Sequence, residues 1–297
     1  MSNKIAVLLA AYNGECYIEE QINTILKQVD VDIDIIISLD LSTDSTLDIC
    51  TEYSSKHDNI FLLPYGEKFG GAGSNFYRLI KDVDLNKYDY ISLSDQDDIW
   101  PNYKLSRAIE KLNKYQCYSA NVTAFWADGR EILIDKAQPQ VAWDFLFEAA
   151  GPGCTYVFKR DFVVKFREWL QKEYLTVDKN IELHDWLIYA FARHHGYKWF
   201  IDTKPMMFYR QHNNNQVGTN NSLAAAKKRF YLMKKSWYRN QTIRISECLG
   251  LQKTEIFRYG LKNGYVGNLY LMLNINKLRR RARDRILLMV ALLFNIF

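Results

Sequence analysis

Cysteines are few in this sequence, and they do not form pairs. The 297 residues include five cysteines, an odd number, and no two stand as a CxxC motif. This excludes a cysteine framework of the secreted type and favours reduced thiols that are buried as small hydrophobic side chains. The five are Cys16, Cys50, Cys117, Cys154 and Cys248.

Long apolar runs are absent as well. No stretch approaches the roughly 20 apolar residues of a membrane-spanning helix. The opening residues, MSNKIAVLLAAYNGE, carry one lysine and a short apolar run without a small-residue cleavage site. We therefore expect a first strand there and not a signal peptide. The sequence also has no internal repeat and no match to the Walker or GxGxxG phosphate-binding templates.

Negative charge is scarce at the C-terminal end. Residues 1–220 hold 23 Lys and Arg against 31 Asp and Glu, whereas residues 221–297 hold 16 against 3. The balances of −8 and +13 sum to the net charge of +5. An acidic body thus carries a basic C-terminal segment, which indicates a partner surface or an anchor.

Apolar strands alternate with helical patterns through the first hundred residues. Strands are expected at residues 4–12, 33–39, 59–64 and 88–98, and helices at 16–28, 42–57 and 71–83. This alternation predicts an α/β fold with a mostly parallel sheet that is covered by helices on both faces. Aromatic residues make up 14% of the chain, which suits core packing and also a carbohydrate or nucleotide surface.

The middle of the chain is mixed. We expect a helix at residues 103–115, an antiparallel strand pair at 121–127 and 130–136, a helix opening at 184 and a strand at 197–212. The polar loop NNNQVGTNNS marks a domain boundary, so that residues 1–220 form one domain and 221–297 a basic helical segment.

The densest chemical signal is Asp95-Gln96-Asp97-Asp98 at the end of the fourth predicted strand. Three carboxylates in four residues repel one another unless a cation lies between them, and oxygen ligands suit Mg²⁺ or Mn²⁺. A solvated acidic turn is the alternative. Because these acids end a buried strand, the metal site is favoured.

Asp40 ends the second predicted strand, where ligands of open α/β sheets bind. Tyr12-Asn13-Gly14 ends the first strand and should lie at the same edge, although Asn-Gly is also ordinary turn chemistry. The segment GGAG before SNFYRL either brings backbone N–H groups to a phosphate or is a flexible connection.

Two later motifs are open to two readings. His184-Asp185-Trp186 begins a helix, so Asp185 is either a general base beside a stacking aromatic ring or a residue that stabilises the helix N-terminus. Arg210 and His212, in YRQH, either contact a diphosphate or a metal or form a surface charge pair.

Taken together, SLDLSTDST, SLSDQDDIW, GPGCTYVFKR, HDWL and YRQH resemble the motifs of family-two glycosyltransferases of GT-A fold over about the first 215 residues. The combination is most similar to bacterial rhamnosyltransferases of surface polysaccharide assembly. The resemblance implies a dTDP-rhamnose or similar donor, a lipid-linked glycan acceptor, a divalent Mg²⁺ or Mn²⁺ ion, and a peripheral location on the cytoplasmic face of the membrane. It leaves homo-oligomer formation open.

The resemblance also implies a role for each motif residue. Asp185 would be the general base of an inverting transfer, and the metal would be held by Asp97 and His212. Donor contacts would come from Ala11, Tyr12, Asn13, Asp40, Asn75, Asp95, Gln96 and Arg210. Acceptor contacts would come from Trp100, Gly153, His184 and Trp186.

The segment SLDLSTD departs from the family pattern. Leu39 and Leu41 stand where the family usually has an acid and a glycine, and leucine tolerates positive φ poorly. We therefore expect altered donor-base contacts, and we expect Leu39→Asp with Leu41→Gly to raise donor affinity if the site is merely weakened. The departure also supports a rival function, a GT-A protein that binds a nucleotide sugar or scaffolds an assembly without turnover. A nucleotidyltransferase is disfavoured because no basic phosphate-gripping loop lies near the N-terminus.

The C-terminal sequence joins a basic cluster to a short apolar end, NKLRRRARDRILLMVALLFNIF. Residues 286–297 are too few to span a bilayer, so an amphipathic or obliquely inserted anchor on an anionic membrane is expected. The alternative is a helix pair packed on the catalytic domain or between protomers. Charge alone would suit nucleic acid, but the acidic body and the lack of a nucleic-acid motif argue against it.

Overall fold

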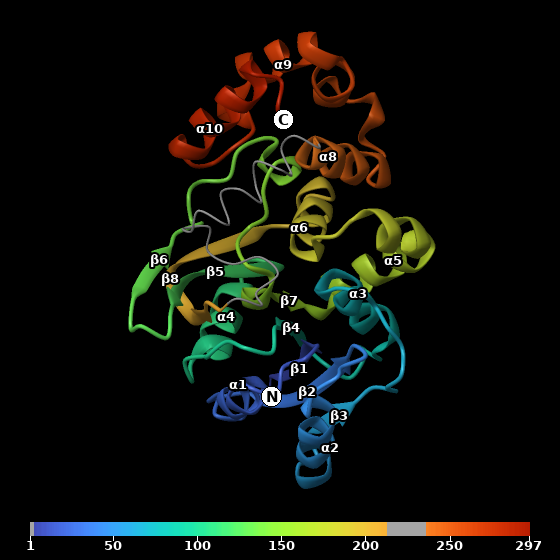
Figure 1. The fold of residues 1–297 in the computed structure, drawn as a ribbon, viewed down its shortest axis with the longest axis vertical. Coiled ribbons are helices and arrows are strands. Elements are labelled where there is room, and N and C mark those ends of the chain that lie inside the picture. The colour runs from blue at the N-terminus through green and yellow to red at the C-terminus, as the bar shows by residue number, and fades with distance from the viewer. Residues whose placement is uncertain (1–2, 213–235) are drawn as a thin grey trace.

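The computed structural model of the protein describes residues 3–212 and 236–297 (Figure 1). The expected domain boundary near residue 220 lies outside the described residues. The strands are β1 (Lys4–Ala11), β2 (Asp32–Leu39), β3 (Ile60–Leu62), β4 (Tyr90–Ser94), β5 (Cys117–Phe125), β6 (Glu131–Ile134), β7 (Val157–Lys159) and β8 (Trp199–Arg210). The main helices are α1 (Ile18–Leu26), α2 (Thr46–Lys56), α3 (Ala72–Asp82), α4 (Lys104–Leu112), α5 (Arg160–Asn180), α6 (His184–His194), α8 (Trp237–Cys248), α9 (Gly264–Leu273) and α10 (Ala282–Leu293).

The eight strands form one sheet in the order β3-β2-β1-β4-β7-β5-β6, and β8 pairs with β5. The first four strands in this order are parallel to one another, as the alternation of strands and helices predicts. Strand β7 is antiparallel to both of its neighbours, and β5 with β6 forms the expected antiparallel pair. The parallel pairing of β5 with β8 was not predicted.

Both faces of the parallel half are buried. Alternate residues of β1 enter two separate hydrophobic clusters, with Ile5 and Val7 in one and Ala6 and Leu8 in the other. The first cluster includes apolar residues of α1 and α4, and the second includes residues of α3, α5 and α6. A run without polar alternation, such as that of β1, is what a strand covered on both faces requires.

The C-terminal helices pack onto the rest of the protein. Helix α8 contacts α5 and the 3-10 turn η1 (Asp144–Leu146), and α9 lies between α10 and the π-helical segment η4 (Ile256–Leu261). Figure 1 shows α9 and α10 at the end of the molecule opposite to β1 and α2. None of the helices within residues 3–212 and 236–297 is both long enough and apolar enough to cross a membrane.

Candidate active site

The parallel strands bring the predicted motifs to one edge of the sheet. In the register of β1, Ala11 is opposite Leu39 and Leu9 is opposite Ser94. The residues that follow these strand ends are therefore neighbours, as expected from the carboxyl ends of parallel strands. Residues 11–14, 40–46 and 95–98 form this edge.

The carboxylates that follow β4 lie in a crowded and largely buried environment. Burial, and then the charge of Asp97, raises the pKa of Asp95 to about 7. Burial raises the pKa of Asp98 well above its usual range, and Asp97 and Asp95 add to the effect. The Cys154 thiol lies beside both acids, and one ligand atom from each of Asp95, Asp98 and Cys154 falls within 4.8 Å of the others. Such mutual repulsion is relieved by a cation.

These residues fit a divalent cation. Among the residues described, the buried Oδ2 of Asp98 has no hydrogen-bond partner, which leaves a carboxylate oxygen with an unmet requirement. Oδ2 of Asp97 lies 2.7 Å from Nε2 of His212, so strand β4 and the chain after β8 converge at this point. Carboxylate oxygens with an imidazole nitrogen suit Mg²⁺ or Mn²⁺. Asp98 and Cys154 were not among the predicted ligands, although both lie in motifs that the sequence analysis singled out, DQDD and GPGC.

Gln96 is used by the fold itself. Its side-chain amide accepts a hydrogen bond from the Tyr12 N–H and donates one to the Tyr12 carbonyl, both at 2.8 Å. Asn13 adopts a φ of 44° and accepts a hydrogen bond from the Thr43 N–H at 2.8 Å. The Tyr12 side chain is 50% exposed. The loop after β1 is thus held in place, with the Tyr12 ring open to solvent for a ligand.

Asp40 accepts three backbone hydrogen bonds. Its Oδ1 receives the N–H groups of Leu41 and Phe69, each at 2.8 Å, and its Oδ2 receives that of Gly70 at 2.9 Å. The buried carboxylate therefore anchors the loop that precedes α3 in this conformation. A contact with the nucleotide base stays a prediction, and it would compete with these bonds.

The two leucines beside Asp40 need no unusual backbone. Leu39 pairs within β2 and is 1% exposed in the core, whereas Leu41 is 45% exposed, and neither has a positive φ. The backbone here therefore differs from a glycine turn and carries no positive φ at either leucine, and the altered donor-base contacts stay a prediction. Asn13, Asp30, Ser236 and Asn295 are the described non-glycine residues with positive φ.

Asn75 joins the ends of β1 and β2 from the first turns of α3. Its buried side-chain amide donates to the carbonyls of Ala11, at 3.3 Å, and Ser38, at 3.0 Å. The side-chain oxygen of Asn75 accepts from the Ser38 hydroxyl. Ala11 and Asn75 were predicted as donor contacts, and in the structure their hydrogen bond helps to join α3 to the ends of β1 and β2.

Arg210, at the end of β8, binds the acidic segment from outside. Its Nε donates to the Asp97 carbonyl at 2.9 Å, its N–H donates to Oδ1 of Asp98 at 3.2 Å, and its guanidinium pairs with Glu20. These contacts orient the carboxylates.

Asp185 stands in the first turn of α6, and burial raises its pKa to about 6. The charge of Asp185 is also one of the smaller causes of the raised pKa of Asp95. A side chain at Gly153 would place its Cβ 2.5 Å from Nε2 of His184 and 3.1 Å from Cβ of Asp185. The absence of a side chain at Gly153 therefore lets the GPGC turn lie directly against HDW.

The other predicted acceptor residues are buried. His184 stacks on Phe76 with ring centroids 4.1 Å apart, and burial lowers its pKa to about 3, so it is neutral near pH 7. Trp186 is 4% exposed and donates its indole N–H to the Phe145 carbonyl at 3.0 Å. Trp100 is 3% exposed beneath the buried ammonium of Lys104. The structure thus gives both tryptophans a core-packing role, and their acceptor contacts stay predictions. Lys104 was missed because a lysine in an amphipathic helix carries no signal of burial.

Comparison with known proteins decides the family. Residues 6–145 match the family model of glycosyl transferase family 2. A dTDP-rhamnosyl transferase, RfbG of Shigella flexneri, is 50% identical over 292 residues, which are 97% of this chain and 100% of that protein. The chain belongs to glycosyl transferase family 2. This family-two protein is therefore a glycosyltransferase.

Solved structures agree on the fold. The TarS 1–349 fragment from S. aureus, in complex with UDP, superposes with a TM-score of 0.58 at 15% identity and covers 99% of this chain and 88% of that one. The mannosyltransferase PcManGT from Pyrobaculum calidifontis, in complex with GDP-Man and Mn²⁺, superposes with a TM-score of 0.54 at 13% identity, with 97% and 84% covered. The family-two protein has the GT-A fold that the sequence predicts.

Proposed function

We propose that the protein transfers L-rhamnose from dTDP-rhamnose to a hydroxyl of a lipid-linked glycan, with inversion at the anomeric carbon, in bacterial surface polysaccharide synthesis. The donor assignment is supported by the full-length similarity to a dTDP-rhamnosyl transferase. The transfer chemistry is supported above all by one observation, the Asp185 carboxylate in the first turn of α6, which lies against the Gly153 turn and whose burial raises its pKa to about 6.

Asp185 would act as the general base. At pH 7 a carboxylic acid of this pKa is largely ionised, yet it is more basic than an ordinary aspartate and so accepts a proton more readily. It takes the proton from the acceptor hydroxyl as that oxygen attacks the anomeric carbon, and the bond to the nucleoside diphosphate breaks on the opposite face. One displacement of this kind inverts the configuration.

Asp97 and His212, with Asp95 and Asp98 beside them, would hold a Mg²⁺ or Mn²⁺ ion. When bound, this ion supplies Lewis-acid stabilisation of the charge that develops on the leaving diphosphate. The crowded carboxylates and the unpartnered Asp98 oxygen support this assignment, and the Mn²⁺ in the PcManGT complex is consistent with it. Arg210 would keep the acidic segment in position through its bonds to Asp97 and Asp98.

The activity is tested by nucleotide release. The protein is incubated with Mn²⁺, a lipid-linked acceptor and one of dTDP-rhamnose, UDP-glucose or GDP-mannose, and the freed nucleoside diphosphate is measured. We expect release with dTDP-rhamnose, loss of release with EDTA, and a product of inverted anomeric configuration by NMR. If no donor is turned over, the rival function of a nucleotide-sugar-binding scaffold replaces this proposal.

We also propose that the outer face of α9 and α10 rests on an anionic membrane surface. In α10 and at the residue that follows it, apolar side chains are 45–68% exposed, at spacings that align on one side of a helix: Ile286, Leu287, Val290, Leu293 and Phe294. The opposite side of α10, with Leu288, Ala291 and Leu292, is buried against the protein. A helix that is apolar on both sides requires a second partner, and the neighbouring arginines suit anionic headgroups.

Vesicle flotation tests the membrane surface. Replacing Ile286, Leu287 and Phe294 with serine should move the protein out of the floating fraction of phosphatidylglycerol vesicles without changing its unfolding temperature. Leu175→Ser is the matched control, because Leu175 is 83% exposed on α5. Equal flotation of the triple variant and the control would refute the membrane surface.

A further inference from the structure

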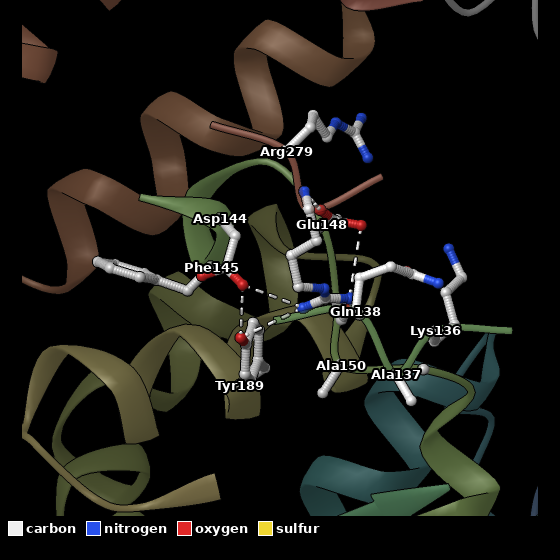
Figure 2. A network of polar contacts seen from close by, with 12 residues as sticks. Lys136, Ala137, Gln138, Asp144, Phe145, Glu148, Ala150, Tyr189 and Arg279 are labelled. Carbon is white, nitrogen blue, oxygen red and sulfur yellow. Dashed lines mark hydrogen bonds and ion pairs between the residues drawn. The ribbon is translucent and has the colours of Figure 1, made fainter. Parts of the chain in front are cut away.

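Two basic side chains near the active site are not paired directly with an acid within the part of the chain that the structure describes. Lys136 follows β6, and Arg279 lies between η5 (Ile275–Lys277) and α10. Neither side chain makes a hydrogen bond or an ion pair with the part of the chain that the structure describes, and Figure 2 draws no dashed line to either. The Nε of Arg279 is buried without a partner. Both side chains are half-buried, and a partly desolvated cation gains from an anion that pairs with it.

The acids that adjoin this pair are already used. Asp144 binds Arg193 at 2.8 Å and Arg280 at 3.2 Å, and Glu148 lies 3.4 Å from the Arg280 guanidinium and accepts the Arg280 N–H at 2.7 Å. Figure 2 shows Arg279 and Lys136 on different sides of Glu148. Asp144 and Glu148 therefore pair with Arg193 and Arg280. They make no ion pair with Lys136 or Arg279.

Charges of both signs act on Lys136. Burial lowers the pKa of Lys136, the charge of Glu148 opposes this, and the charges of Arg279 and Arg280 lower the pKa further. An anion bound by both Lys136 and Arg279 would offset the repulsion between these two cations.

This pair adjoins the acceptor side of the active site. A Cβ at Gly151 would lie 3.9 Å from Cβ of Lys136, and two residues further on Gly153 lies against His184 and Asp185. The charge of Lys136 also lowers the pKa of Asp185. The basic pair is therefore next to the turn that carries the proposed general base.

We propose that Lys136 and Arg279 form a binding site for a phosphate or diphosphate group of the acceptor. The assignment rests on the proposed transfer to a lipid-linked glycan, in which that group joins sugar to lipid. A guanidinium and an ammonium that approach one anion from two sides match the several oxygens of a phosphate. Arg280, buried between Asp144 and Glu148, holds Arg279 in place through the backbone.

The probe is decyl diphosphate, with binding to the full-length protein measured by calorimetry in EDTA, so that no cation assembles the donor diphosphate site. We expect Lys136→Gln with Arg279→Gln to weaken binding at least tenfold. Arg283→Gln is the matched control, since Arg283 is 71% exposed and its pair with Asp284, at 3.5 Å, is a surface contact. The control should stay within twofold of the unchanged protein.

The remaining measurements separate the sources of the anion and the two proposals. Inorganic pyrophosphate that binds more tightly than decyl diphosphate would overturn the acceptor assignment, as would a double variant that loses only binding to phosphatidylglycerol vesicles. Binding of dTDP with Mn²⁺ should be unchanged in the double variant, because the proposed donor site does not include Lys136 or Arg279. If the protein without substitutions turned over no donor, the proposed function would fail. If the double variant bound decyl diphosphate as tightly as that protein, this inference alone would fail.

Discussion

The Asp185 carboxylate sets a pH dependence for the reaction. Because burial raises its pKa to about 6, the ionised base is lost as the pH falls through 6. We expect kcat to be level above about pH 7 and to fall tenfold for each unit below about pH 6. Asp185→Asn should lower kcat by roughly 10² to 10⁴ and abolish this limb of the profile. A pH profile of nucleotide release measures both, and a variant that keeps the limb would remove Asp185 from the base role.

The same residue should cost stability. Asp185 ionises with an ordinary aspartate pKa of 3.8 in the unfolded chain and with a pKa of about 6 in the folded chain, so the folded state holds an extra proton between these two values. Stability is therefore lost as the pH rises through this window, and the loss is complete above it. At pH 7 Asp185→Asn should raise the free energy of unfolding, measured in urea, by about 3 kcal/mol. At pH 3.5 the two proteins should unfold together.

Leu39 belongs to the core and not to the donor site. Its side chain is 1% exposed in the cluster that includes α1 and α4, so Leu39→Asp buries a carboxylate without a partner. We expect a loss of roughly 4 kcal/mol or more in the free energy of unfolding, with donor affinity lost as the protein unfolds. Leu41→Gly, at a 45% exposed position, should change it by about 1 kcal/mol at most. Urea denaturation of both variants decides the matter, and a gain in donor affinity for Leu39→Asp would contradict the core assignment.

At the residue level the sequence showed which side chains gather but not what each one contacts. The strand-end positions of Tyr12, Asp40 and Asp95 follow from the alternation of apolar strands. The hydrogen bonds of Asp40 with backbone N–H groups 29 and 30 residues away could not be predicted in this way, because the path of a loop leaves no periodic pattern in the sequence. The burial of Trp186 was equally hidden, since a tryptophan near a helix start suits a core and a cleft alike.

At the level of elements, close approach between the GPGC turn and α6 governs where the base stands. Gly153→Ala would put a Cβ 2.5 Å from Nε2 of His184, and that ring cannot retreat because it is stacked on Phe76. The first turn of α6 should shift, and a misplacement of about 1 Å costs roughly 100-fold in rate. Donor binding should hardly change. Steady-state kinetics and dTDP titration measure the two effects.

Gly196→Ala is the matched control for this change. Gly196 has a φ of +77° and open space around it, so alanine there strains the backbone by about 1 kcal/mol without meeting another atom. Its expected signature is the reverse of that of Gly153→Ala, with lower stability and an unchanged kcat. If Gly153→Ala also lost only stability, the turn would not position Asp185.

The elements themselves were largely predictable. Apolar runs of β1 and β2 and the helical spacing of α1 and α4 needed only local pattern, and the parallel order follows from their alternation. The parallel pairing of β8 with β5 was not predictable from the sequence. These strands are some 80 residues apart and are brought together by packing and not by local sequence.

At the scale of the whole molecule, the C-terminal segment is built into the catalytic fold. Phe297 stacks near Phe147 with ring centroids 5.9 Å apart, and Arg239 donates to the Phe297 carbonyl at 3.1 Å. Deleting residues 277–297 would thus remove core contacts together with the outer face of α10. Loss of membrane binding after that deletion would not by itself identify an anchor, which is why exposed side chains are the better targets.

Arg280 is the strongest tie between this segment and the active-site helix. Its fully buried guanidinium contacts Asp144, Glu148 and the Tyr189 hydroxyl, which is 3.2 Å away on α6. Arg280→Met leaves two buried carboxylates short of a partner, so we expect a loss of about 3–5 kcal/mol in the free energy of unfolding. Adding Glu148→Gln should restore part of it, because the neutral amide no longer needs a cation, while Asp144 keeps Arg193. Denaturant unfolding of the single and double variants measures this recovery. A segment that was only a tether would show neither the loss nor the recovery, since its removal would leave the free energy of the catalytic fold unchanged.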